Sequence, residues 1–195
     1  MRLFVALDID DPIRERIQLF MEGVRGFAPD VRWVRPEALH ITLKFIGERP
    51  DESRVVITQA LSGIRIAPVQ VAFRGCGFFP TPKAPRVFWI GIEAGAELGQ
   101  LAVSVDESLH ALGIEKEEHG FHPHLTLARR GAASGSPRRQ GGDAPNNSFS
   151  RLQEKLKVLG SPEFGTMTAR EFFLYQSQLS SGGSRYTKLE QFPLA

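Results

Sequence analysis

The sequence reads His40-Ile41-Thr42-Leu43 and, 84 residues later, His124-Leu125-Thr126-Leu127. The same offset aligns Arg2-Leu3-Phe4 with Arg86-Val87-Phe88, and no gap is needed between the two matches. Self-similarity at a fixed period reports architecture. Only two copies of a long unit are present, which indicates an internal duplication. A duplicated fold with a pseudo-two-fold axis would bring its two equivalent histidines toward one cleft.

Each motif lies in a segment with the character of a β-strand, rich in apolar and β-branched residues over 39–46 in the first copy. Because strand side chains alternate between faces, the histidine and threonine of the first motif are predicted to share a face with Lys44. The histidine and threonine of the second motif share the equivalent face. A half-buried surface strand can carry one such motif by chance. Two copies at an offset that also aligns the upstream strands favour a shared site.

Two imidazoles on either side of one ligand suit acid–base catalysis, because histidine has an unperturbed pKa of about 6.5. In phosphodiester hydrolysis one group deprotonates the attacking water, and another protonates the leaving oxygen across the phosphorus. The two threonine hydroxyls can donate hydrogen bonds to the non-bridging oxygens. A phosphodiester carries its own electrophile, so this chemistry needs no metal, no cofactor and no covalent nucleophile.

The motifs resemble those of the 2H phosphoesterases, and most closely the RNA 2′,3′-cyclic phosphodiesterase branch, also called the 2′-5′ RNA ligase family. The resemblance covers nearly the whole chain. It is carried by residues 40–47 and 122–129, with further similarity at 2–7, 33–40, 77–80, 85–89, Ser177 and Tyr186.

The resemblance implies hydrolysis of an RNA terminal 2′,3′-cyclic phosphate to a 2′-phosphate, so the expected partner is an RNA 3′ end or a nucleotide cyclic phosphate. It also implies that His40 is the proton donor to the leaving oxygen and that His124 is the proton acceptor that activates water. Thr42 and Thr126 complete the catalytic set. The residues alone do not distinguish donor from acceptor, because the two motifs are nearly symmetric.

Three further residues are candidates for substrate contact. Arg129 resembles the phosphate-contacting arginine of the family, although strict alternation puts it opposite His124, so a twist or bulge is needed. Lys44, on the predicted face of His40, is a second phosphate candidate. Phe79 can stack on a base, as Phe78 and Trp33 can, and core packing is the alternative for each.

Other functions remain open. The same histidines could act on small cyclic nucleotides, ADP-ribose cyclic phosphate or 2′-5′ linkages, and ligation would be the reverse reaction. A non-catalytic RNA-binding module gives no reason for two histidines and two threonines. The spacing of His119, His122 and His124 suits metal ligation, but Pro123 and the missing carboxylate partner favour His122 as a residue that orients the second motif.

Composition fits a single domain, 1–195, with copies at about 1–84 and 85–168. Of the 195 residues 42% are apolar, enough for a core. The net charge of +2 argues against a broad electrostatic grip on nucleic acid. The single cysteine, Cys76, excludes an internal disulfide and is expected to be a small packed residue. No segment reaches membrane-spanning length. We expect a cytoplasmic protein that binds no membrane and has no obligate protein partner.

The expected fold class is α+β, a two-lobed duplicated fold in which two antiparallel sheets face a central cleft and helices pack outside. Residues 131–148, rich in Gly, Ser and Pro, are predicted to be a flexible insertion, either a flap over RNA or a solvated surface loop. The predicted strands are 3–9, 39–46, 69–73 and 87–92 with a terminal hairpin of 166–176 and 185–192, and the predicted helices are 11–26, 51–63, 98–112 and 149–159.

Overall fold

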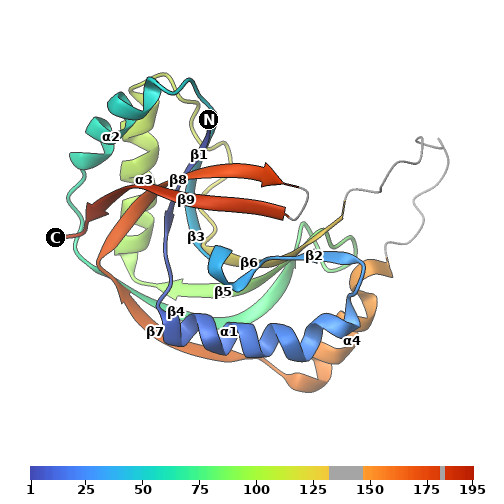
Figure 1. The fold of residues 1–195 in the computed structure, drawn as a ribbon. Helices are drawn as coiled ribbons and strands as arrows, with labels where there is room; N and C mark the ends of the chain where they lie inside the picture. The colour runs from blue at the N-terminus through green and yellow to red at the C-terminus, as the bar shows by residue number, and fades with distance from the viewer. Residues whose placement is uncertain (132–146, 181–182) are drawn as a thin grey trace, which may run out of the picture.

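In the computed structural model, which describes residues 1–131, 147–180 and 183–195, the strands form one curled antiparallel sheet (Figure 1). The strand order is β7-β4-β5-β6-β3-β1-β8-β9, and β2 pairs with β6 beside this path. The strands are β1 (Arg2–Leu7), β2 (Val31–Trp33), β3 (Ile41–Glu48), β4 (Val69–Phe79), β5 (Val87–Ala94), β6 (His124–Arg130), β7 (Glu163–Ala169), β8 (Glu171–Ser180) and β9 (Gly183–Pro193). The helices are α1 (Asp11–Val24), α2 (Ser53–Ser62), α3 (Ala96–His110) and α4 (Ser150–Leu159), with short 3₁₀ turns η1 (Arg25–Phe27), η2 (Pro36–Ala38) and η3 (Asn147–Phe149).

The sheet has two halves that meet between the motif strands β3 and β6. Ile41 lies opposite Leu125 where these two strands pair. One half is β9-β8-β1-β3 and the other is β6-β5-β4-β7. The predicted α+β fold with antiparallel sheets and outer helices is confirmed, and the two sheets are joined through this pair. The two motifs are therefore on neighbouring strands.

The two halves repeat the same order of elements. A strand, a helix and the motif strand begin at Arg2, Asp11 and Ile41 in the first half, and at Val87, Ala96 and His124 in the second. Each helix packs on the opposite half, α1 against β7 and α3 against β3. The boundaries of the two copies stay a prediction.

The main core lies between the sheet and the helices. The predicted stripe of α1 is buried at Ile13, Ile17, Met21 and Val24, as expected of apolar residues at helical spacing. A second, smaller cluster lies on the other face of β1 and β8, and it consists of Phe4, Ala6, Phe173 and Tyr175 with Tyr186 packed against it. Phe4 and Tyr186 of this second cluster line the site described below.

The chain changes halves within 166–176, and the prediction of a single strand over this range is wrong. β7 pairs with β4 at one edge of the sheet, and β8 pairs with β1 and β9 in the other half. Arg170 lies between them, and its carbonyl accepts a hydrogen bond from the Leu194 amide at 2.8 Å. The terminal hairpin is therefore β8–β9 alone.

No helix in the described ranges is long and apolar enough to cross a membrane. The cytoplasmic location stays a prediction. The predicted insertion 131–148 falls almost entirely outside the described residues, so its role also stays a prediction.

Candidate active site

The two motifs line one cavity of about 420 Å³. The side chains of His40, Thr42, His124 and Thr126 all border it, and so does Arg129. The rest of the lining comes from β1, the segment before β3, Phe45 of β3 and the β8–β9 hairpin. The structure thus brings the four predicted catalytic residues to one space.

Both imidazoles are held in the same way. His40 Nδ1 donates to the Ala38 carbonyl at 2.8 Å, and His124 Nδ1 donates to the His122 carbonyl at 2.7 Å. A carbonyl oxygen only accepts, so each neutral ring carries its proton on Nδ1. Nε2 is then the nitrogen left to exchange a proton with a ligand. His122 orients the second motif through its backbone carbonyl.

Aromatic rings fix the planes of both imidazoles. The His40 ring lies 4.8 Å from the Phe4 ring and meets Tyr186 edge-on at 5.1 Å. On the other side, Phe79 meets His124 edge-on at 5.0 Å and packs on Trp89 at 5.0 Å. Phe79 is therefore a wall beside His124, partly buried at the end of β4.

The surroundings of both imidazoles favour their neutral forms. Burial, with a smaller contribution from the Arg129 guanidinium, lowers the pKa of His40 from its ordinary 6.5 to about 4, against the raising effect of the Ala38 carbonyl. Burial also lowers the pKa of His124, again with a contribution from Arg129. Both rings are therefore mainly neutral near pH 7.

A β-bulge brings Arg129 to the cavity. Phe88 pairs with Ala128 and Trp89 with Thr126, so Leu127 is an extra residue in β6. The alternation of faces shifts by one residue after Thr126. Arg129 Nη2 consequently lies 3.5 Å from Thr126 Oγ1 and lines the cavity. This is the bulge that the sequence-based assignment of Arg129 required.

The same kind of bulge removes Lys44 from the site. Ala6 pairs with Thr42 and Val5 with Lys44, so Leu43 is the extra residue in β3. Lys44 consequently faces the helices, with 4% of its side chain exposed. Its ammonium lies 2.6 Å from Asp106 of α3 and donates to the Glu115 carbonyl at 2.7 Å. The prediction that Lys44 shares the face of His40 is corrected.

The position after Lys44 reaches the cavity instead. Phe45 lines it with 57% of its side chain exposed, and it is the counterpart of Arg129 at the 84-residue offset. Phe4 and Phe45 were missed because β1 reads as uniformly apolar and β3 as regularly alternating. The cavity lining also includes Arg2, Val34, Ser177, Ser184 and Tyr186.

No group of three or more His, Cys, Asp or Glu side chains in the described part of the chain is arranged to hold a metal ion. His119, His122 and His124 do not form such a group. The two motifs and Arg129 together supply two imidazoles, two hydroxyls and one guanidinium to the cavity.

A curled antiparallel sheet with two His-x-Thr motifs lining one cavity points to the phosphoesterases as the class of protein. The chain belongs to the LigT-like phosphoesterase family: the family described as LigT like Phosphoesterase matches residues 7–89 and again 90–186.

Similar proteins span the whole chain. It is 38% identical over 192 residues to the RNA 2′,3′-cyclic phosphodiesterase of Archaeoglobus fulgidus, covering 98% of this chain and 99% of that protein. It is 31% identical to the protein of the same name from Methanothermobacter thermautotrophicus, covering 99% and 98%.

Solved structures agree with this family. TT0787 of Thermus thermophilus is 30% identical with a TM-score of 0.76, covering 100% of this chain and 98% of that one. E. coli LigT complexed with 3′-AMP is 27% identical with a TM-score of 0.76, covering 99% and 97%.

Proposed function

We propose that this chain hydrolyses the 2′,3′-cyclic phosphate at the 3′ end of RNA to a 2′-phosphate, with His40 as the acid and His124 as the base. The observation that carries the proposal is the matched pair of imidazoles. Each donates Nδ1–H to the carbonyl two residues before it, and both line one cavity. The names of the relatives from Archaeoglobus fulgidus and Methanothermobacter thermautotrophicus support the substrate class.

One water is consumed in the proposed reaction. Its oxygen attacks phosphorus while its proton passes to Nε2 of His124. The bond between phosphorus and O3′ breaks on the opposite side, and O3′ takes a proton from Nε2 of His40. The products are a 3′-hydroxyl and a 2′-phosphate. Each positioned acid or base typically contributes a factor of about 10² to 10⁴.

The remaining groups hold the phosphate. The hydroxyls of Thr42 and Thr126 donate to the non-bridging oxygens, where negative charge increases in the transition state. Arg129 lies beside Thr126 and supplies a positive charge to the same oxygens. Phe79 packs against the imidazole of His124, the proposed general base. The exposed ring of Phe45 can stack on a nucleobase of the substrate.

Substrate binding would also favour the protonated form of His40, which takes its proton from solvent. The phosphodiester carries a negative charge that opposes the effect of Arg129 on the imidazoles. A ring with so low a pKa is a strong acid once it is protonated, which suits protonation of an alkoxide leaving group.

The test compares an RNA ending in a 2′,3′-cyclic phosphate with free 2′,3′-cyclic nucleotides, with mapping of the phosphate in the product. We expect the RNA to give a 2′-phosphate, and the His40→Ala/His124→Ala double variant to give none. A 3′-phosphate product, or turnover of the free nucleotides alone, would contradict the proposal. The latter outcome would favour the small cyclic nucleotides as substrates.

A further inference from the structure

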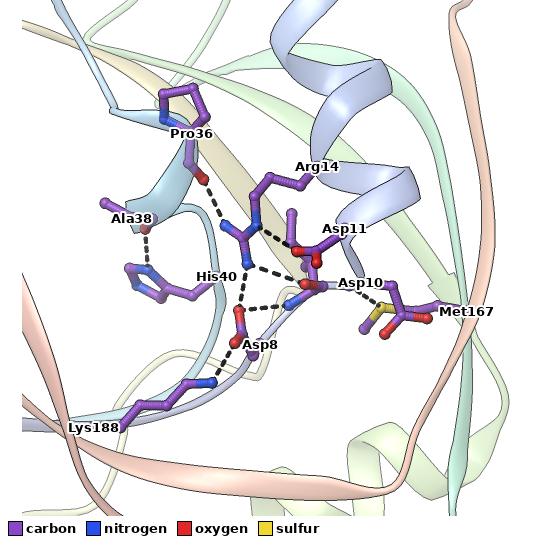
Figure 2. Close-up of polar contacts among 10 residues, drawn as sticks. Asp8, Asp10, Asp11, Arg14, Pro36, Ala38, His40, Met167 and Lys188 are labelled. Atoms are coloured by element: carbon purple, nitrogen blue, oxygen red, sulfur yellow. Dashed lines mark hydrogen bonds and ion pairs between the residues drawn. The ribbon is translucent and has the colours of Figure 1, made fainter.

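A charged group of residues connects α1 to the turn that precedes His40 (Figure 2). Arg14 donates through Nη1 to the Pro36 carbonyl at 2.5 Å and through Nη2 to Asp8 Oδ1 at 2.6 Å. Nη2 also reaches the Ile9 carbonyl at 3.0 Å. Only 17% of the Arg14 side chain is exposed. One guanidinium thus joins the end of β1 to the first residue of η2.

Asp8 is itself fixed on several sides. Its Oδ1 accepts from the Ile9 amide at 2.8 Å, and its Oδ2 accepts from Lys188 of β9. Burial raises the pKa of Asp8, but the hydrogen bond from Lys188 and the nearby charges outweigh it, so the pKa lies below its ordinary value. Asp8 is therefore a carboxylate near neutral pH and a firm anchor for Arg14.

The turn η2 links this anchor to His40. It starts at Pro36, whose carbonyl Arg14 holds, and ends at Ala38, whose carbonyl holds His40 Nδ1. Three residues leave little freedom between these two carbonyls. We propose that Asp8 and Arg14 position His40: they hold η2 so that the Ala38 carbonyl selects the Nδ1–H tautomer and directs Nε2 into the cavity. The inference rests on the proposed function for its catalytic consequence.

The second motif lacks this support. At the 84-residue offset the counterparts of Asp8 and Arg14 are Ile92 and Leu98, both buried and apolar. The brace formed by Asp8 and Arg14 is therefore an asymmetry in a site whose two imidazoles are otherwise held alike. It serves the histidine to which the proposed mechanism gives the acid role.

The test replaces Arg14 by Met and uses Arg16→Met as the matched control. Arg16 lies on the same helix and also donates to a backbone carbonyl, that of Phe164 at 2.9 Å, but this carbonyl belongs to β7. We expect Arg14→Met to lower kcat by about tenfold to a hundredfold, the usual cost of a misplaced catalytic group. In a His40→Ala background the same change should cost nothing further. Arg16→Met should leave kcat near its wild-type value.

A spectroscopic measurement separates positioning from catalysis. The ¹⁵N shifts of the His40 ring should show the Nδ1–H tautomer in the wild type and in Arg16→Met, and a mixture of tautomers in Arg14→Met. Arg14→Lys keeps a cation beside Asp8 but not the fork that also reaches Pro36, so it should shift the tautomer in the same direction even if the Met variant does not fold.

An unchanged tautomer in both Arg14 variants, or a full further loss in the His40→Ala background, would overturn the positioning role. A changed tautomer in a protein that does not cleave cyclic phosphates would instead count against the proposed function alone.

An independent observation concerns Arg32 on β2. Arg32 pairs directly with Arg129 across the β2–β6 ladder, and directly opposed residues in antiparallel strands share a face. Both side chains are exposed, and in the part of the chain that the structure describes neither guanidinium has a carboxylate partner. Like charges directly opposite each other are destabilising. An anion bound by both guanidinium groups, or a chain of phosphates that contacts each in turn, would remove that repulsion.

We infer that Arg32 binds the phosphodiester next to the terminal phosphate in a single-stranded RNA. Arg129 reaches the terminal phosphate in the cavity, and Arg32 lies one strand further out, at about 4.8 Å in the pairing direction. This contact would let the site favour an RNA end over a free cyclic nucleotide. It deepens the proposed function and rests on it.

The test measures kcat/KM of Arg32→Gln on a short RNA ending in a 2′,3′-cyclic phosphate and on a 2′,3′-cyclic mononucleotide. We expect a loss of about tenfold on the RNA and no change on the mononucleotide. The slope of log kcat/KM against log salt on the RNA should fall in magnitude by about 0.7, the value for one phosphate contact on a single strand. Arg130→Gln, an equal charge change on the next residue of β6 and the opposite face, is the control.

Equal losses on both substrates, or the same loss in Arg130→Gln, would overturn the role of Arg32. If the wild type cleaves neither substrate, the proposed function fails. In that case the affinity for an RNA bearing a 2′-phosphate, measured for the wild type and for Arg32→Gln, tests the contact by itself. Weaker binding by Arg32→Gln supports the contact, and equal binding contradicts it.

Discussion

His40 and His124 are chemically alike and have unequal surroundings. The ring of His40 is enclosed by Phe4 and the two tyrosines of the C-terminal hairpin, and burial brings its pKa to about 4. Within the described ranges His124 has one aromatic neighbour, Phe79, and burial also lowers its pKa. A difference of this kind allows two identical side chains to take opposite roles in proton transfer.

At this scale the first expectation concerns turnover. Replacing His40 or His124 by Ala should lower kcat on a cyclic phosphate by at least about 10²-fold, because each loses a proton transfer. Replacing Thr42 or Thr126 by Val should cost less, since both proton transfers remain. Single-turnover kinetics at saturating substrate would show this. A threonine variant slower than both histidine variants would contradict the assignment.

The lowered pKa values also set the pH dependence. The reaction needs one protonated and one neutral ring, so the rate should follow a bell-shaped curve. In the free enzyme both pKa values lie below the ordinary 6.5, which places the kcat/KM optimum on the acid side of neutrality. The phosphate charge raises both pKa values in the complex, so the kcat optimum should lie at higher pH. Coinciding optima for kcat and kcat/KM would be evidence against this effect of the substrate.

At the scale of the elements, two bulges decide which side chains reach the cavity. Leu43 and Leu127 are the extra residues, and each is the last residue of a His-x-Thr-Leu motif. Strand alternation correctly predicted that the histidine and the threonine of each motif share a face, because these residues precede the bulge. It failed for Lys44, which follows it. A bulge is set by pairing with the neighbouring strand, so a single segment of sequence does not reveal it.

Other elements escaped prediction for similar reasons. β2 has three residues and exists only through its pairing with β6, a contact far away in the sequence. The break at Arg170 lies within a run of strand-forming residues, and only the separate partners of β7 and β8 show that it is two strands. The helices were predicted well, because their apolar stripes and bounding glycines are local.

Lys44 gives an element-scale test. Its ammonium ties β3 to Asp106 of α3 in a mostly buried ion pair. Replacing Lys44 by Met should lower the free energy of unfolding by about 3 kcal/mol, because the Asp106 carboxylate loses its partner. The change should leave kcat and KM of the folded protein within about twofold. Lys44→Met/Asp106→Leu should recover part of the stability, measured by denaturant unfolding. A raised KM in Lys44→Met would contradict this structural role and indicate that Lys44 contacts the substrate.

At the scale of the whole molecule, the cavity lies where the two halves of the sheet meet. The β3–β6 contact places one motif from each half side by side, and α1 and α3 each pack across onto the opposite half. The placement of the proposed catalytic residues thus depends on the association of the halves. Folding and the protonation state of the site should be linked through His40, because partial burial in the folded protein lowers the pKa of its ring.

This linkage has a definite sign. The folded-state pKa of His40, about 4, lies below the unfolded value of 6.5, so stability is full above pH 6.5 and is lost as the pH falls toward 4. His40→Asn keeps a donor for the Ala38 carbonyl and does not titrate. Between pH 7 and pH 5 the wild type should lose about 2 kcal/mol more unfolding free energy than this variant. Equal losses in urea titrations would show that His40 is not buried as a neutral ring.

The division of labour between the two histidines can be measured directly with a substrate whose leaving oxygen is replaced by a far better leaving group, such as a nitrophenolate. This substrate needs no acid, so it should restore most of the activity of His40→Ala and leave His124→Ala inactive. The proposed roles give this result because only the base remains necessary when the leaving group departs unaided. Rescue of His124→Ala instead would reverse the roles, and equal rescue of both variants, or of neither, would contradict the one-acid, one-base mechanism.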